Sequence, residues 1–335
     1  MAASDPHPYS RLTPDVVLNA IDALGLRCDG RLLALNSYEN RVYQVGQDEG
    51  PPIVAKFYRP DRWTDAQILE EHAFGAELDA AEIPVVAPMA IGGVTLHRFE
   101  NFRLAAFPRK GGRAPELEDE TTLEWLGRFI GRIHAVGATK AFRLRPALDI
   151  ASFGEEPRAF LLENGFIPAD LVASWTSAAD LALEGVRGAF QRAGRYASIR
   201  LHGDCHAGNV LWTPSSGNSI GGPHFVDLDD ARMGPAVQDF WMLISGDRRS
   251  MSRQLGRLLK GYEDFAEFDD RELQLIEPLR TLRLLHYSAW IARRWDDPAF
   301  PIAFPWFNTV RYWQDRVLEL REQVAAMQEP ALVPE

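Results

Sequence analysis

Residues 202–209 carry side chains that suit phosphoryl transfer. The segment His202-Gly203-Asp204 is followed by Asn209 five positions after the aspartate, and Asp227 comes 18 positions after that asparagine. Phosphoryl transfer needs a carboxylate that orients the attacking hydroxyl and accepts its proton, and hard oxygen ligands for the metal ion that neutralises the triphosphate. We therefore predict Asp204 as the base, Asn209 and Asp227 as Mg²⁺ ligands, and Asp227 as catalytic through that metal.

Other interpretations of this segment are open. An isolated Asp-x₄-Asn is common in ordinary loops and turns. His202, Asp204, Cys205 and His206 would suit a transition metal by type, but their close spacing in one loop makes simultaneous ligation awkward. Cys205 and His206 as a nucleophile pair is a further hypothesis, although neighbours in sequence rarely point at each other. We expect these two side chains to pack rather than to react.

A lysine and a glutamate form the second candidate pair. Lys56 ends the segment Val54-Ala55-Lys56 on a predicted strand, and Glu71 follows 15 positions later on a predicted helix. On a helical wheel Glu71 falls among bulky apolar side chains, so it needs a cation, and Lys56 can supply one. In kinases such a pair orients the α- and β-phosphates. We predict that both bind nucleotide; an unrelated pair of surface charges is the alternative.

Two further polar positions have candidate roles. Ser37 lies in residues 36–41, which join the first two predicted strands where a phosphate loop would lie, although this loop contains no glycine. Ser37 and the N–H groups beside it are candidates for binding phosphate, and a plain polar hairpin loop is the alternative. Asp239 begins an apolar segment, so it would either cap a helix or brace the catalytic loop as a buried carboxylate.

The first third of the chain is predicted to be rich in strands. Thr13 and Pro14 begin a helix that Gly25 ends, and Thr64 with Gln67 begins another with capping-box spacing. Five strands are expected at residues 31–36, 41–45, 53–58, 85–91 and 102–107. Nearly everything from residue 121 onward is predicted to be helical, and the first of these helices has an apolar stripe. The exceptions are two short strands at 210–212 and 224–228, which a loop over 214–223 joins.

These elements predict an α+β, bilobal fold. Residues 1–107 would form a nucleotide-binding lobe with a small five-stranded antiparallel sheet and one key helix. Residues 108–112 would form a hinge, and 113–335 a mostly helical lobe with the catalytic loop and the metal site. A chain of 335 residues is long enough for both lobes, and ligands usually bind between such lobes.

Composition narrows the expected partners. The net charge of −11 and the pI near 5.3 leave no broad basic face for a nucleic acid. Cys28 and Cys205 lie far apart and fit a reduced, cytoplasmic protein. The first ten residues are polar and contain proline, unlike a secretory signal, and no apolar run is long enough to cross a bilayer. We expect a cytoplasmic protein without nucleic-acid or membrane partners.

At these residues the chain resembles the aminoglycoside phosphotransferase and choline kinase branch of the protein-kinase-like fold, whose hallmark is His-Gly-Asp-x₄-Asn. Within that branch it is similar to the stress response kinase family of bacterial Ser/Thr protein kinases. The similar stretches are residues 35–44, 56–60, 68–72, 200–212, 225–241 and 276–307. The loop at 213–223 looks longer than expected for that family.

The resemblance implies a cytoplasmic, monomeric kinase that uses Mg²⁺ and ATP to phosphorylate serine and threonine hydroxyls of proteins and protects bacteria under stress. Carried over by position, it makes Asp204 the proton acceptor, Asn209 and Asp227 the Mg²⁺ ligands, and Ser37 a residue that touches ATP.

Three functional hypotheses follow. The leading one is an ATP- and Mg²⁺-dependent Ser/Thr protein kinase of the bacterial stress response. The alternative is a small-molecule kinase acting on an amino alcohol, a homoserine-like compound or a sugar, because the twelve positions from Asp227 to Asp239 offer little platform for a peptide. The third is a nucleotide-binding scaffold without catalysis, against which Lys56, Asp204 and Asn209 argue together with Asp227.

Overall fold

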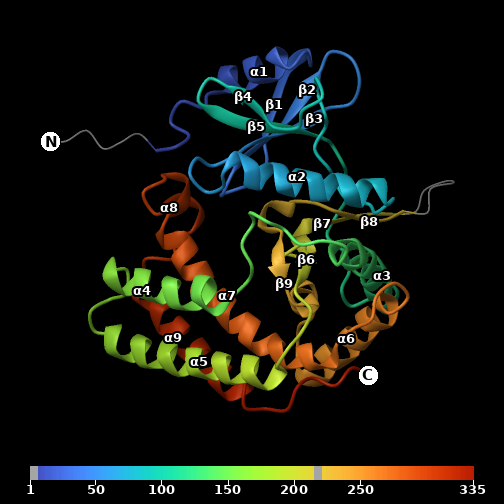
Figure 1. Cartoon of the computed structure of the whole chain (residues 1–335). Coiled ribbons are helices and arrows are strands. Elements are labelled where there is room, and N and C mark those ends of the chain that lie inside the picture. The colour runs from blue at the N-terminus through green and yellow to red at the C-terminus, as the bar shows by residue number, and fades with distance from the viewer. Residues whose placement is uncertain (1–6, 215–220) are drawn as a thin grey trace. The chain divides into compact units, whose positions relative to one another are not determined.

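The contacts within the chain divide it into two units, whose helices and strands are labelled in Figure 1. The computed structural model describes residues 7–214 and 221–335. Unit 1 contains Met1–Pro115 and Gly208–Asp229, and unit 2 contains Glu116–Ala207 and Asp230–Glu335. The chain therefore passes from unit 2 back to unit 1 within the predicted catalytic segment, between Asp204 and Asn209.

Unit 1 is built on a five-stranded sheet of order β1-β2-β3-β5-β4, in which all neighbours are antiparallel. Its strands are β1 Cys28–Ala34, β2 Arg41–Gln47, β3 Ile53–Phe57, β4 His97–Phe99 and β5 Phe102–Pro108. In the register of the central strands, Lys56 lies opposite Val42 of β2 and Ala105 of β5. The predicted α+β class with a small five-stranded antiparallel sheet is confirmed.

Two helices of unit 1 begin where the sequence predicts. They are α1 Pro14–Ala23 and α2 Asp65–Ala80. Thr13 Oγ1 accepts a hydrogen bond from Val16 N at 3.3 Å, and Thr64 forms a complete capping box with Gln67. These caps satisfy N–H groups that the first turn of a helix leaves without a backbone partner.

Helices α1 and α2 pack against different sets of strand residues. Ile21 of α1 belongs to a buried cluster with Phe57, whereas Ile68 of α2 packs with Tyr58 and Ala105. Side chains alternate between the two faces along a strand. Lys56 therefore lies on the face that α2 covers.

The predicted strand at 85–91 is wrong. Its residues form only single bridges, between Val85 and Phe225 and between Ile91 and Val94, and β4 is the fifth strand of the sheet instead. Pro84 and Pro88 have no N–H to donate to a ladder, so this segment cannot continue as a strand.

A hairpin from the middle of the chain also belongs to unit 1. Its strands are β7 Val210–Thr213 and β8 Gly222–Phe225, and the short 3₁₀ segments η2 Ala207–Asn209 and η3 Leu228–Asp230 lie before and after it. Of the predicted loop between the strands, residues 215–220 lie outside the described residues. Phe225 N donates to Pro84 O at 2.8 Å, and Trp212 N donates to Arg113 O at 2.7 Å.

These hydrogen bonds explain why the contact grouping differs from the predicted domain ranges. The sequence patterns placed the hairpin, with the metal site, in the 113–335 lobe, because the hairpin follows the catalytic loop in the chain. The contacts group it with residues up to 115 instead. In other respects the ranges 1–107, 108–112 and 113–335 stay a prediction.

Unit 2 is mostly helical. Its helices are α3 Glu120–Gly137, α4 Glu156–Glu163, α5 Val172–Ala193, α6 Arg248–Tyr262, α7 Ile276–Ala292, α8 Ala299–Ala303 and α9 Val310–Ala326. Shorter helical segments are η1 Ala151–Glu155, η4 Ala236–Asp239, η5 Trp241–Leu243 and η6 Asp270–Leu275. Within residues 7–214 and 221–335, no helix is long and apolar enough to cross a membrane.

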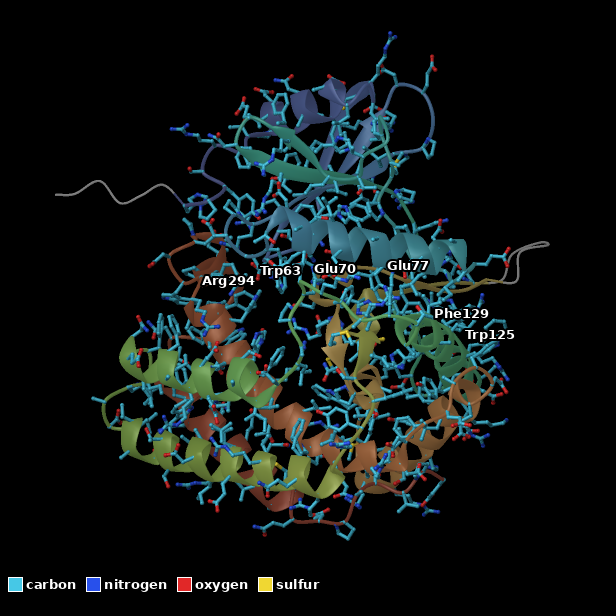
Figure 2. The ribbon with its side chains drawn as sticks, viewed as in Figure 1. Trp63, Glu70, Glu77, Trp125, Phe129 and Arg294 are labelled. Carbon is cyan, nitrogen blue, oxygen red and sulfur yellow. The ribbon has the colours of Figure 1, made fainter. Side chains whose placement is uncertain are left out.

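Helix α3 shows how closely the helices of unit 2 pack. Its predicted apolar stripe is buried, and α6 approaches it so closely that a Cβ on Gly127 would lie 1.9 Å from Leu258 O. Trp125 and Phe129, one turn apart on α3, stack with ring centroids 5.8 Å apart (Figure 2). The small residue at position 127 therefore allows the close contact between α3 and α6.

Unit 2 also contains a small sheet that the sequence patterns did not predict. Strand β6 Ile199–Leu201 pairs antiparallel with β9 Arg232–Gly234. Strands of three residues are too short to show a periodic pattern. Because β6 leads directly into His202, this sheet fixes the start of the predicted catalytic loop.

Candidate active site

The loop that carries Asp204 is held by a buried carboxylate. Asp239, which is 1% exposed, accepts hydrogen bonds from the backbone N–H groups of His202 and Gly203, both at 2.8 Å. His134 Nε2 lies 3.0 Å from the same carboxylate, and Gln238 Nε2 donates to Gly203 O at 2.9 Å. The hypothesis that Asp239 is a buried carboxylate that braces this loop is confirmed; that the loop is catalytic stays a prediction.

Gly203 is the residue that lets this loop turn. Its φ is +84°, in the left-handed region, and a Cβ there would lie 2.2 Å from Asp230 O. A side chain would therefore be strained and would also collide with the backbone. This explains why a glycine precedes the aspartate.

Asp204 lies half-buried beside an arginine and a histidine. Arg283 Nη1 donates to its Oδ1 at 2.5 Å, and His206 Nε2 lies 3.5 Å from its Oδ2. Burial by itself raises the pKa of Asp204, but the hydrogen bond with His206 and the charge of Arg283 lower it to about 2, against a further raising effect of Asp230. The carboxylate is therefore ionised at neutral pH and can accept a hydrogen bond from a hydroxyl.

Sequence reasoning missed Arg283. It lies on α7, 79 positions from the aspartate that it contacts, and no short motif connects the two. The available signal was a second arginine, Arg280, three positions earlier in the same helix, which places both on one side of α7.

The two residues after Asp204 differ from each other. Cys205 is 1% exposed, and burial raises the pKa of its thiol well above the usual range, so the expectation that it packs is confirmed. For His206 that expectation is wrong, because its side chain is 37% exposed and faces Asp204. The described residues contain no group of three or more His, Cys, Asp or Glu side chains arranged to hold a metal.

In unit 1, Lys56 contacts two carboxylates. Its Nζ lies 2.9 Å from Asp227 Oδ1 and 3.1 Å from Asp229 Oδ1. Burial by itself lowers the pKa of Lys56, but the charges of Asp227, Asp229 and Glu71 hold it well above its usual range. The structure therefore brings together Lys56, Glu71 and Asp227, which the sequence singled out separately.

Asp229 is a second charged residue that sequence reasoning left without a role. It is buried, and besides Lys56 it forms an ion pair with Arg62. Arg62 Nη1 also lies 3.5 Å from Glu39 Oε2, in the loop between β1 and β2. Cations and carboxylates thus alternate through a buried network that links this loop to Asp229.

Asn209 and Asp227 offer the oxygen donors that Mg²⁺ prefers, an amide and a carboxylate. Val226 N donates to Asn209 O at 3.0 Å, which ties the two segments together beside Asp227. Asp227 has a φ of +61°, and its side chain is 52% exposed. An exposed carboxylate fits a Mg²⁺ ion, which usually keeps several of its water ligands.

The remaining predicted residues also lie in unit 1. Glu71 is 4% exposed on α2, inward-facing as the helical wheel predicted. Ser37 Oγ donates to Asn40 O at 3.2 Å across the loop between β1 and β2, so this loop is closed by a side chain instead of a glycine turn. The contact of Ser37 with ATP stays a prediction.

The sequence matches the model of the APH phosphotransferase enzyme family over residues 31–276. The chain belongs to this family. It is 44% identical over 324 residues to stress response kinase A of Escherichia coli K12, covering 97% of this chain and 96% of that protein. It is 43% identical over the same length to serine/threonine protein kinase RdoA of Salmonella typhimurium LT2. This phosphotransferase is therefore an enzyme of the kinase type, as predicted.

Solved structures confirm the kinase-like fold. Amicoumacin kinase hAmiN, in complex with AMP-PNP, Ca²⁺ and Ami, superposes with a TM-score of 0.71 at 19% identity, over 96% of this chain and 95% of that one. A microcompartment-associated aminopropanol kinase gives a TM-score of 0.68 at 19% identity, over 93% of this chain and 98% of that one. At this identity the likeness concerns the fold of the phosphotransferase alone.

Proposed function

We propose that this phosphotransferase is an ATP- and Mg²⁺-dependent Ser/Thr protein kinase with a role in the bacterial stress response. The observation that carries the proposal is Asp204, an ionised carboxylate on a loop that Asp239 holds rigid. Phosphoryl transfer to an alcohol asks little covalent chemistry of the protein beyond a positioned side chain that accepts the hydroxyl proton. The names of the curated relatives, a stress response kinase and a Ser/Thr protein kinase, support a protein acceptor.

In the proposed reaction the hydroxyl oxygen of the acceptor forms a bond to the γ-phosphorus of ATP. The bond from that phosphorus to the bridging oxygen breaks, ADP leaves with the electron pair, and the hydroxyl proton passes to the Asp204 carboxylate. Lys56, held by Glu71 and Asp227, would bind phosphate oxygens, and Ser37 would contact ATP. Mg²⁺ held by Asn209 and Asp227 would neutralise charge on the triphosphate.

The acceptor is tested by incubating the enzyme with labelled ATP, a generic protein substrate and a panel of small alcohols. We expect label on serine and threonine of the protein. Label that appears only on small alcohols would establish the small-molecule alternative, which the aminopropanol kinase represents among the solved structures.

A variant without the proposed base serves as the control for this assay. Asp204→Ala should lower the rate of transfer by ~10²-fold or more, the usual scale for loss of a general base. Nucleotide binding should change little, because we assign it to Lys56, Glu71 and Ser37. An unchanged rate of transfer would remove Asp204 from the mechanism.

A further inference from the structure

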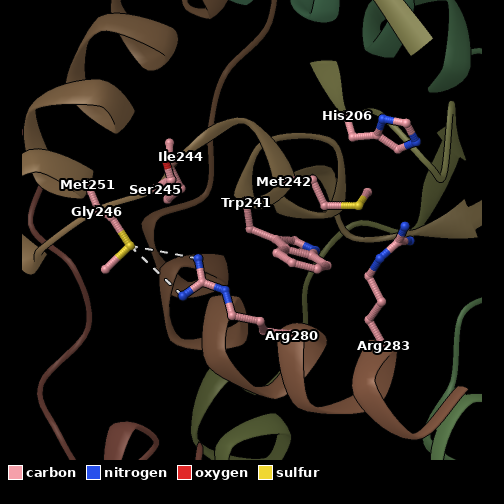
Figure 3. A pocket seen from close by; sticks show the side chains of 9 residues that line it. All are labelled: His206, Trp241, Met242, Ile244, Ser245, Gly246, Met251, Arg280 and Arg283. Carbon is pink, nitrogen blue, oxygen red and sulfur yellow. Dashed lines mark hydrogen bonds between the residues drawn. The ribbon is translucent and has the colours of Figure 1, made fainter. Parts of the chain in front are cut away.

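A cavity of about 460 Å³ lies in unit 2 beside Asp204 (Figure 3). Two of the residues that line it, His206 and Arg283, are the ones that contact the Asp204 carboxylate. A group bound in this cavity would therefore lie next to the hydroxyl whose proton Asp204 accepts.

The charged lining of the cavity is basic. Arg280 and Arg283 both line it, and none of its lining residues is an aspartate or glutamate. The two arginines are three positions apart on α7, and in Figure 3 Trp241 lies between them. The Arg280 guanidinium lies over the Trp241 ring, 5.6 Å from its centroid, which limits the directions in which its N–H groups can point.

The contacts of Arg280 are suited to an additional oxyanion. Its Nη1 donates to Glu277 Oε1 at 3.0 Å. Toward the cavity, Nη1 and Nη2 meet Met251 Sδ at 3.9 and 3.7 Å, as the dashed lines in Figure 3 show. A thioether is a weak acceptor, whereas a carboxylate forms short, charge-assisted bonds with a guanidinium. A ligand carboxylate would therefore satisfy this edge of Arg280 better than the sulfur does.

Arg283 adds a second cation without closing the cavity. It contacts Asp204 through Nη1 at 2.5 Å, and its side chain is 39% exposed. A guanidinium has five N–H donors in a planar fork, so one Arg283 can hold Asp204 and also face a ligand. Met242 and Ile244 supply apolar lining that suits the methylene groups of a bound side chain.

We propose that this cavity, the Arg280 cavity, binds the carboxylate of an acidic residue close to the serine or threonine that is phosphorylated. The proposal rests on the protein kinase function proposed above and adds a substrate preference to it. Arg280 is its specificity-determining residue. A lysine or arginine at the same position of the substrate would be disfavoured, because none of the residues that line the cavity is an aspartate or glutamate that could pair with it.

The test uses synthetic peptides with one serine and a single Glu placed at each position from three before to three after it, with matched Gln and Lys peptides. We expect kcat/KM for the best Glu peptide to exceed that of its Gln counterpart by about 10-fold, the scale of one charge-assisted hydrogen bond. The Lys peptide should have the lowest kcat/KM of the three. Equal values for Glu and Gln at all positions would overturn the proposal.

Variants assign the preference to the cavity. Arg280→Met should bring the Glu-to-Gln ratio close to one, and Arg280→Lys, which keeps the charge, should retain part of it. Arg271→Met removes another arginine of unit 2, paired with Asp269 and 60% exposed, and should leave the ratio unchanged. A ratio that survives in Arg280→Met would also overturn the proposal.

A small-molecule arm separates this proposal from the proposed function. A hydroxy acid and its amide are offered alongside the peptides. If only small alcohols are labelled and the acid exceeds the amide in an Arg280-dependent way, the anion site stands and the protein acceptor is wrong. If only small alcohols are labelled and acid and amide react equally, the anion site itself is wrong.

Discussion

Burial and the neighbouring side chains shift the pKa of Asp204 in opposite directions. Burial would favour the neutral acid, but Arg283 and His206 stabilise the carboxylate, and its pKa falls to about 2. The group is then a weak base that is fully ionised at neutral pH. Its proposed work is to hold the acceptor hydroxyl and to take the proton once transfer to phosphorus has begun.

Lys56 has the reverse environment. It is a buried cation that contacts Asp227 and Asp229. A charge buried in the protein is costly unless an opposite charge pairs with it, so these groups stabilise one another. Asp229 also forms an ion pair with a second cation, Arg62.

Replacement of Lys56 should therefore cost stability as well as nucleotide binding. We expect Lys56→Met to lower the free energy of unfolding by about 3 kcal/mol, because it leaves buried carboxylates without one of their cations. Urea denaturation monitored by tryptophan fluorescence would measure this. Lys110→Met, at an exposed lysine of the same unit, should change stability by less than about 0.5 kcal/mol, and equal losses in the two variants would contradict the assignment.

At the scale of elements, the catalytic loop depends on segments that are distant in sequence. Strand β6 starts it, β9 pairs with β6, and η4 supplies Asp239, whose carboxylate bonds two successive backbone N–H groups. Asp239 touches no reacting atom in the proposed mechanism, so it acts as a positioning residue.

Asp239→Asn should reveal this positioning role. The amide offers one oxygen where the carboxylate offers two, so one buried N–H group would face an NH₂ group, at a cost of about 2 kcal/mol. We expect kcat to fall while KM for ATP stays near its original value. Asp119→Asn is the matched control, because Asp119 also accepts a backbone N–H, from Thr122 at 2.8 Å, but asparagine is an equally good cap there. A parallel rise in KM for ATP in Asp239→Asn would contradict the positioning role.

For the whole molecule, one buried acid couples folding to pH. Glu272 of η6 is 2% exposed and accepts a hydrogen bond from Val237 N at 2.9 Å. Burial raises its pKa from 4.5 to about 7, although that backbone hydrogen bond acts in the opposite direction. Between these two values the folded chain keeps a proton that the unfolded chain has lost. The stability that this proton contributes is present below pH 4.5 and is lost as the pH rises to about 7.

Glu272→Gln should remove this dependence. The amide keeps an oxygen for Val237 N but does not ionise, so the variant should gain up to about 3 kcal/mol relative to the parent between pH 5 and pH 8. Denaturation curves at several pH values would measure the difference. Glu267→Gln, at an exposed glutamate of the same unit, should leave the pH dependence unchanged. An identical slope for Glu272→Gln and the parent would show that another group is responsible.

Local patterns in the sequence were enough to predict several elements. The Thr13 and Thr64 caps, the apolar stripe of α3 and the strands around Lys56 depend on neighbours within a few positions, and all of them are present. The predicted strand at 85–91 is wrong because Pro88 within it, and Pro84 just before it, have no N–H to donate to a ladder. Strands β6 and β9 were not predicted because three residues are too few to show a periodic pattern.

By itself, the sequence determined a set of residue types at spacings that suit phosphoryl transfer, namely Asp204, Asn209 and Asp227, because these candidate residues lie close together in the chain. The tertiary structure alone decided what surrounds them. The contacts of Arg283 with Asp204 and of Asp229 with Lys56 join positions far apart in the chain, as does the lining of the Arg280 cavity. Only the packing of the folded chain brings such positions within hydrogen-bonding distance, so no local pattern could predict them.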